Sequence, residues 1–346
     1  MQLKNFIFLL ILLSSNTSFS QKKISEAKFV SIGGIEQWIT INGSDINNPV
    51  VLLIHGGPGS SMSHFKDDIY AEWQKEFTIV HWDQRGAGRT FGRNCPKEIN
   101  DEFYTNNLLS VSDMTNDGID VTQYILKRLS QRKVILMGTS WGSILATKMA
   151  QKHPELFHAY IGHSQFVDFT RNIDDAYSHV YKIANIKEDT PTLFKLNDLG
   201  PPPYQRAKNY GQLLRVVKQF EKEFADPAPS NWWRIAADYE NNEDSRDRYN
   251  GDDYSFLNLV GDHTIGVPSM VSNIDFNKTA LTFKLPVFMI QGEHDILCSK
   301  ELNKPYFEKI RAPRKEYVIV SNAAHGFNEH IVKKQYEIAK SLRVQN

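Results

Sequence analysis

The sequence has few cysteines and no excess of either charge. Two cysteines, Cys95 and Cys298, occur among 346 residues, and 40 lysines and arginines balance 40 aspartates and glutamates. Two cysteines without a close histidine pattern do not suggest a metal site. Balanced charge gives no indication of nucleic acid or an anionic membrane as a partner. Sequence alone leaves open whether the two cysteines pair.

Long apolar runs are absent as well. The N-terminal run from Phe6 to Leu13 has eight residues, whereas a membrane-spanning helix needs about 20. It follows Lys4 and is followed by mostly small, polar residues up to Ser20, the three-part pattern of a secretory signal peptide. We therefore expect a signal peptide over residues 1–20, cleavage after Ser20 and a secreted or periplasmic protein. No stable membrane span is expected after cleavage.

What the sequence does contain is a set of short apolar runs that end in polar or glycine-rich residues. Such runs indicate buried parallel strands. Chemistry in open α/β sheets lies at the carboxyl edge of such strands. Four runs are the most informative. Residues 50–54 precede HGGPG and residues 134–137 precede GTSWG. Residues 285–290 precede QGEHD and residues 317–320 precede SNAAHG.

Ser140 is the candidate nucleophile. It is the serine of Gly138-Thr139-Ser140-Trp141-Gly142, a G-x-S-x-G pattern between a predicted strand and a predicted helix. A sharp strand-to-helix turn of this form exposes a serine hydroxyl at the top of a sheet. The flanking glycines leave room for backbone that a Cβ would crowd. The alternative interpretation is a glycine-bounded turn with a solvated serine.

Asp295 and His325 are the candidate acid and base. Both follow predicted strands, and the order serine, acid, histidine is the chain order of α/β-hydrolases. A histidine would take the serine proton, and the carboxylate would orient the histidine. Asp168 is the alternative acid and His330 a weaker alternative base. Loop positions without catalytic roles remain the alternative for both leading residues.

The candidate oxyanion hole consists of two backbone N–H groups, those of Gly57 and Trp141. Trp141 follows the nucleophile, and the second donor of such a site comes from a glycine-rich loop after another strand. Pro58, next to Gly57, has no N–H to donate. The alternative for this loop is a plain turn at the end of a strand.

Together these motifs resemble the prolyl aminopeptidase (proline iminopeptidase) family of α/β-hydrolases. The resemblance covers roughly residues 28–165 and 283–346, and its segments are His55 to Gly59, Asp83 to Gly88, Gly138 to Ser143, Gly292 to Asp295 and His325. It implies an α/β-hydrolase fold, with Asp83 and Arg85 holding the loop beside the site. Thr90 stands where the family usually has serine, and the family's tryptophan–glutamate cap motif is absent.

The predicted fold class is α/β, with a mostly parallel sheet flanked by helices and an inserted, mainly helical cap. The catalytic domain would comprise residues 21–164 and 283–346, and the cap residues 165–282, a stretch too long for a plain loop. Within this plan we expect a hairpin over 28–41 and a helix over 113–129 capped by Ser112 or Asp113. A further helix is expected over 204–224.

The predicted function is that of an exported serine hydrolase that cleaves amide or ester bonds through an acyl-enzyme. The resemblance favours an aminopeptidase on small peptides. A carboxylesterase or lactonase, or a non-catalytic binding protein of the same fold, are the alternatives. The expected partner is a small peptide or small-molecule acyl substrate, with no cofactor, no metal and no nucleic acid. The sequence does not determine the oligomeric state.

Overall fold

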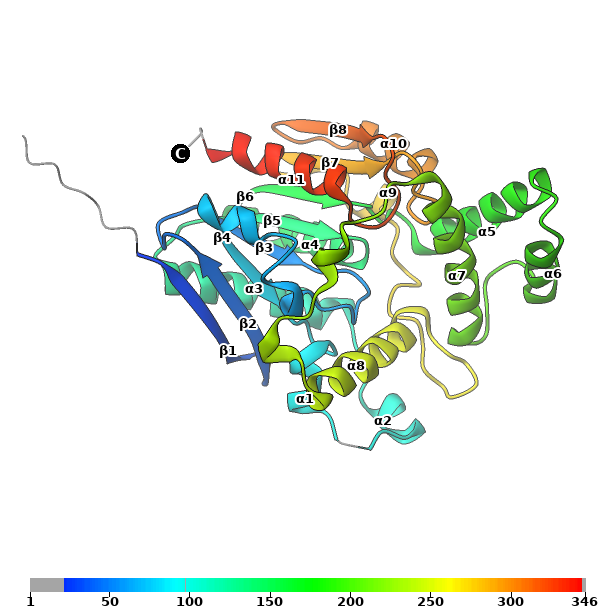
Figure 1. The fold of residues 1–346 in the computed structure, drawn as a ribbon, viewed down its shortest axis with the longest axis horizontal. Coiled ribbons are helices and arrows are strands. Elements are labelled where there is room, and N and C mark those ends of the chain that lie inside the picture. Colours follow the sequence, from blue (N-terminus) through cyan, green and yellow to red (C-terminus); the bar gives the residue numbers. More distant parts are fainter. Residues whose placement is uncertain (1–21, 97, 344–346) are drawn as a thin grey trace, which may run out of the picture.

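A mostly parallel sheet of eight strands crosses the part of the chain that the structure describes. That part, in a computed structural model, comprises residues 22–96 and 98–343, so the predicted signal peptide lies outside it. The spatial order is β1-β2-β4-β3-β5-β6-β7-β8 (Figure 1). The strands are β1 (Ile24–Ile32), β2 (Ile35–Gly43), β3 (Val50–Ile54), β4 (Thr78–Trp82), β5 (Val134–Thr139), β6 (Phe157–His163), β7 (Val287–Gly292) and β8 (Lys315–Val320).

The antiparallel part of the sheet is the predicted hairpin. β1 and β2 pair antiparallel, β2 joins β4 antiparallel, and the strands from β4 to β8 are parallel. The hairpin turns at Gly33 and Gly34, with φ of 57° and 79°. A Cβ on Gly33 would lie 1.9 Å from the Asp117 carboxylate, so this turn needs glycine for space as well as for conformation.

The helices connect and flank these strands. They are α1 (Gly88–Asn94), α2 (Asp101–Asn106), α3 (Val111–Leu129), α4 (Trp141–Lys152), α5 (Phe169–Ile186), α6 (Thr190–Leu199), α7 (Ala207–Phe224), α8 (Asn242–Val260), α9 (Phe276–Thr279), α10 (Lys300–Lys309) and α11 (Glu329–Ser341). Among the described residues, no helix combines the length and apolar character needed to cross a bilayer.

The start of α3 differs from the sequence-based prediction. The helix begins at Val111, and its N-cap is Ser110 rather than Ser112 or Asp113. The Ser110 hydroxyl accepts a hydrogen bond from the Asp113 N–H at 3.0 Å and donates one to the Asp113 carboxylate at 2.8 Å. This reciprocal pairing satisfies an N–H that has no partner within the helix.

Alternate residues of the parallel strands face two separate cores. On β5, Leu136 packs into the larger core with α3, α4 and α10, and Met137 packs into a smaller core with α11. Both side chains are almost fully buried. Burying one such side chain stabilises the fold by about 1.5–3 kcal/mol. These two cores fix the sheet between its helical layers.

Helices α5 to α8 lie in the stretch that was predicted as a cap, with α5, α6 and α7 projecting beyond one end of the sheet (Figure 1). The connection between α7 and α8 is hydrogen-bonded to loops of the sheet. The Asp226 N–H donates to the Asn322 carbonyl, and the Ala236 N–H donates to the His64 carbonyl, both at 2.9 Å. The insertion is therefore fastened to the loop that carries His325.

Candidate active site

Ser140 occupies a strained turn between β5 and α4. Its φ of 54° and ψ of −125° lie in a region that residues with side chains rarely adopt. A Cβ on Gly138 would lie 2.6 Å from the Gly142 carbonyl, and a Cβ on Gly142 would lie 2.1 Å from the carbonyl oxygen of Ile54. The two glycines therefore permit a turn so tight that it packs against the end of β3.

The structure brings the three predicted catalytic side chains together. His325 Nε2 lies 2.8 Å from Ser140 Oγ, and His325 Nδ1 lies 3.1 Å from Asp295 Oδ1. Asp295 follows β7 and His325 follows β8, while Ser164, after β6, donates a hydrogen bond of 3.2 Å to the His325 carbonyl. The Nδ1–H tautomer donates to the carboxylate and leaves Nε2 to accept the serine proton.

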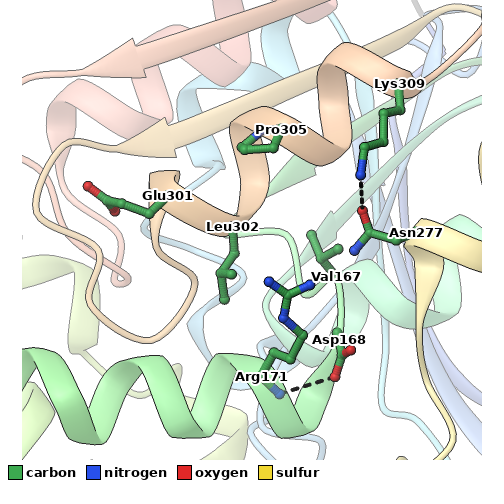
Figure 2. A pocket seen from close by; sticks show the side chains of 8 residues that line it. All are labelled: Val167, Asp168, Arg171, Asn277, Glu301, Leu302, Pro305 and Lys309. Atoms are coloured by element: carbon green, nitrogen blue, oxygen red, sulfur yellow. Dashed lines mark hydrogen bonds between the residues drawn. The ribbon is translucent and has the colours of Figure 1, made fainter.

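The two alternative residues lie elsewhere. Asp168 caps α5 by accepting a hydrogen bond from the Arg171 N–H at 3.1 Å. Figure 2 shows Asp168 and Arg171 on the wall of a pocket. The pocket has a volume of about 110 Å³ and is lined by none of Ser140, Asp295 and His325. His330 instead lies 2.9 Å from the carboxylate of Asp226, in an exposed pair.

The charges around His325 favour its protonated form. Burial by itself lowers the pKa of His325, but the charge of Asp295, its hydrogen bond and the charge of Glu221 outweigh burial and raise that pKa to about 8. Asp295 is also held by the Cys298 N–H, which donates to its Oδ1 at 2.7 Å. A histidine stabilised in this way is suited to hold a proton taken from serine.

Glu221 is a site residue that the sequence analysis missed. It lies on α7, is 7% exposed, and its Oε1 accepts a hydrogen bond of 2.7 Å from the Ile296 N–H. Burial, and then the charge of Asp295, raise the pKa of Glu221 to about 7. In sequence it is one of several charged residues on an amphipathic helix, and no motif distinguishes it.

The two predicted oxyanion donors belong to segments that approach Ser140. Trp141 is the first residue of α4, and N–H groups in the first turn of a helix have no acceptor within the helix. Gly57 has a φ of 108°, and its neighbour Gly56 is so close to the elbow that a Cβ there would lie 3.2 Å from Ser140 Cβ. Both donors are thus carried by backbone that lies next to the serine.

The loop after β4 is fixed by polar contacts, as the resemblance implied for Asp83 and Arg85. The Arg85 guanidinium donates two hydrogen bonds to Asp117 on α3, at 2.8 and 3.1 Å. Asp83 accepts one from the Arg89 N–H at 3.0 Å. Thr90, which replaces the family's serine, donates to the Asp83 carbonyl at 2.6 Å, so its hydroxyl supplies the contact that a serine could make.

The cysteines are separate free thiols, Cys95 half-buried and Cys298 buried. Among the described residues, one group could offer three metal ligands: Asp295, Cys298 and His325, whose ligand atoms lie within 4.8 Å of one another. Two of these side chains already bond each other, and burial raises the pKa of the Cys298 thiol well above its ordinary value.

A parallel sheet with a serine elbow and an aligned histidine and carboxylate is typical of a hydrolase. The chain belongs to the alpha/beta hydrolase fold family, whose model matches residues 49–329. The predicted α/β-hydrolase fold is thereby confirmed.

Its relatives include peptidases. The chain is 29% identical to the "Probable aminopeptidase YbaC" of Bacillus subtilis over 321 residues, which cover 88% of this chain and 92% of the relative. It is 24% identical to the proline iminopeptidase of Arabidopsis thaliana, over 86% of this chain and 74% of that protein. The crystal structure of a Mycobacterium smegmatis proline iminopeptidase superposes with a TM-score of 0.58 at 17% identity, covering 92% and 98% of the two chains. The predicted resemblance to the prolyl aminopeptidase branch is confirmed by these relatives.

Proposed function

We propose that this protein is a serine hydrolase that acts through an acyl-enzyme, and that its substrates are small peptides from which it removes the N-terminal residue. The observation that carries the proposal is the position of the His325 ring between Ser140 Oγ, at 2.8 Å, and Asp295 Oδ1, at 3.1 Å. A hydroxyl becomes an effective nucleophile when a base within hydrogen-bond reach takes its proton.

In this mechanism Ser140 Oγ attacks the carbonyl carbon of the scissile bond while its proton moves to His325 Nε2. Asp295 accepts the Nδ1–H and stabilises the imidazolium. The N–H groups of Gly57 and Trp141 stabilise the oxyanion. His325 then gives its proton to the leaving amine, and water, activated by the same imidazole, releases the acyl group from Ser140.

The aminopeptidase assignment is supported by the relatives, which are named aminopeptidase or proline iminopeptidase. The catalytic geometry itself serves amides and esters equally. Export is proposed from residues 1–20 alone, whose pattern is that of a signal peptide. Mass spectrometry of the protein from its native host would test it, since a chain that still begins at Met1 contradicts cleavage.

A substrate panel with an active-site probe tests the catalytic part of the proposal. The purified chain should react with a fluorophosphonate and hydrolyse aminoacyl arylamides, with proline arylamide among the best. Ser140→Ala should lose both reactions. Labelling that persists in Ser140→Ala contradicts the nucleophile, and turnover of short acyl esters without any arylamide turnover contradicts the aminopeptidase.

A further inference from the structure

Gln84 links the two segments that carry the proposed oxyanion donors. Its Nε2 donates to the carbonyl oxygen of His55 at 2.9 Å, and its Oε1 accepts from the indole N–H of Trp141, also at 2.9 Å. His55 begins the loop that contains Gly57, and Trp141 begins α4. One side-chain amide therefore connects the end of β3 to the nucleophile elbow.

This connection has a single orientation. A flipped amide would set its NH₂ against the indole N–H and its oxygen against the His55 carbonyl, so both hydrogen bonds would be lost. Gln84 is fully buried and Trp141 is 1% exposed, so water cannot replace either bond. Breaking one would leave a buried polar group unpaired.

The backbone of Gln84 adds a third contact to the same loop. Its N–H donates to His55 Nε2 at 3.2 Å, and the other ring nitrogen, Nδ1, lies 2.8 Å from the Gly56 carbonyl. This pattern requires the neutral Nδ1–H tautomer. Burial is consistent with it, because it lowers the pKa of His55 to about 4. The peptide next to Gly57 is thus held in place from the end of β4.

We propose that Gln84 is a positioning residue that fixes the separation of the two oxyanion donors, the N–H groups of Gly57 and Trp141. This inference rests on the proposed function. Oxyanion donors act at 2.7–3.1 Å from the developing charge, and loss of one donor lowers kcat by about 10²–10³-fold. Without the Gln84 hydrogen bonds, the loop that contains Gly57 and the start of α4 can shift relative to each other. We therefore expect loss of these bonds to lower kcat by about 10–100-fold.

The chain offers a matched control in Gln37. Its Oε1 accepts from the indole N–H of Trp82 at 2.7 Å, and its Nε2 donates to the Ile32 carbonyl at 3.2 Å. Gln37 is fully buried and Trp82 is 1% exposed. Gln37 thus makes the same two kinds of hydrogen bond as Gln84, and these join β1, β2 and β4. Its strand, β2, pairs with neither β3 nor β5, the strands that precede Gly57 and Ser140.

The experiment compares Gln84→Met with Gln37→Met in the full chain. The readouts are kcat and KM on an arylamide, the melting temperature, and the affinity for a trifluoromethyl ketone that forms a tetrahedral adduct. Gln84→Met should lower kcat and ketone affinity by similar factors and leave KM within about twofold, because the donors act mainly in the transition state. Gln37→Met should lower the melting temperature comparably and leave kcat unchanged.

Trp141→Phe provides a second test if Gln84→Met does not fold. It removes the indole N–H, keeps the backbone N–H, and should reproduce part of the loss in kcat. Equal kcat values for Gln84→Met and Gln37→Met, or a raised KM with unchanged kcat, would overturn the inference alone. A wild-type chain that neither turns over substrate nor reacts with fluorophosphonate would overturn the proposed function, and the inference with it.

Discussion

Glu221 on α7 accepts a hydrogen bond of 2.7 Å from the N–H of Ile296, the residue that follows Asp295. Helix α7 therefore holds the loop that presents Asp295, the proposed triad acid. Glu221 also adds a negative charge that raises the pKa of His325. Helix α7 thus contributes to the electrostatics around His325 as well as to the position of the loop.

Removing this charge should shift the pH dependence of activity. Glu221→Gln keeps an oxygen that can accept from Ile296 but removes the charge, so the pKa of His325 should fall from its value of about 8. The imidazole must be neutral to act as a base, so the acid limb of kcat/KM should move to lower pH, by less than about one unit. Glu223→Gln, on the same helix but paired with Lys187 at the surface, is the control. An acid limb that stays in place, or moves to higher pH, contradicts this role.

The identity of the triad acid can be tested by a pair of isosteric changes. Asp295→Asn should lower kcat by about 10³–10⁴-fold, because an amide cannot hold His325 in the Nδ1–H tautomer as the carboxylate does. Asp168→Asn should leave kcat unchanged, since that side chain caps α5. The measurement is steady-state turnover of both variants. Activity lost in Asp168→Asn but retained in Asp295→Asn would reverse the assignment.

Arg89 fastens α1 to the insertion. Its guanidinium donates to both carboxylate oxygens of Asp244 on α8, at 2.7 and 2.8 Å, and lies 3.8 Å from the centroid of the Tyr239 ring. Arg89→Met would remove the guanidinium partner of a largely buried carboxylate, which would keep its hydrogen bond from Asn241, and we expect a loss of about 3 kcal/mol in the free energy of unfolding. Arg93→Met, on the same helix, removes a surface pair with Glu36 and should cost less than about 1 kcal/mol. Denaturant unfolding of the two variants should separate them, and equal losses would contradict the prediction.

Buried histidines should make the fold sensitive to acid. Burial lowers the pKa of His55 to about 4 and those of His64, His81 and His163 to about 3. An unfolded chain binds protons at these residues below about pH 6.5, whereas the folded chain does not until about pH 3–4. Their contribution to stability is therefore complete above the unfolded pKa and is lost as the pH falls from about 6.5 toward 4.

Two buried acids act in the opposite direction. Burial raises the pKa of Asp83 to about 7, as it does for Glu221, so the folded chain holds these protons where the unfolded chain has lost them. His325, whose pKa is raised to about 8, and Asp117, whose pKa burial raises, act in the same direction as these acids, so the histidine effect is best tested one residue at a time, by the slope that His81 contributes. Melting temperatures from pH 8 to pH 4.5 measure this slope. His81→Leu should make the fall in stability with pH less steep, by the amount expected for about one bound proton. An unaltered slope would show that His81 does not contribute.

The positions of the strands were readable from the sequence because their signals are local. β7, however, ends at Gly292 rather than Ile290, and β8, predicted as buried, is an edge strand with Ile319 45% exposed. A buried parallel strand is a continuous apolar run, and the elbow needs glycines on both sides of Ser140, so both features appear within a few consecutive residues. Parallel strands place their carboxyl ends at one edge, which made the association of Ser140, Asp295 and His325 an expectation before any distance was known. The cap of α3 was placed wrongly because Ser110, Ser112 and Asp113 are all competent caps.

The amino-acid sequence by itself indicated the fold class, the three candidate residues at strand ends and the glycine-rich loop, because each strand end and each motif is set by neighbours along the chain. Only the tertiary structure decided which acidic residue reaches His325, that Glu221 joins that pair from α7, and that Gln84 bonds both His55 and Trp141. These contacts depend on hydrogen-bond distances between residues far apart in the chain. Such distances are set by how the sheet and helices pack, and no local pattern records them.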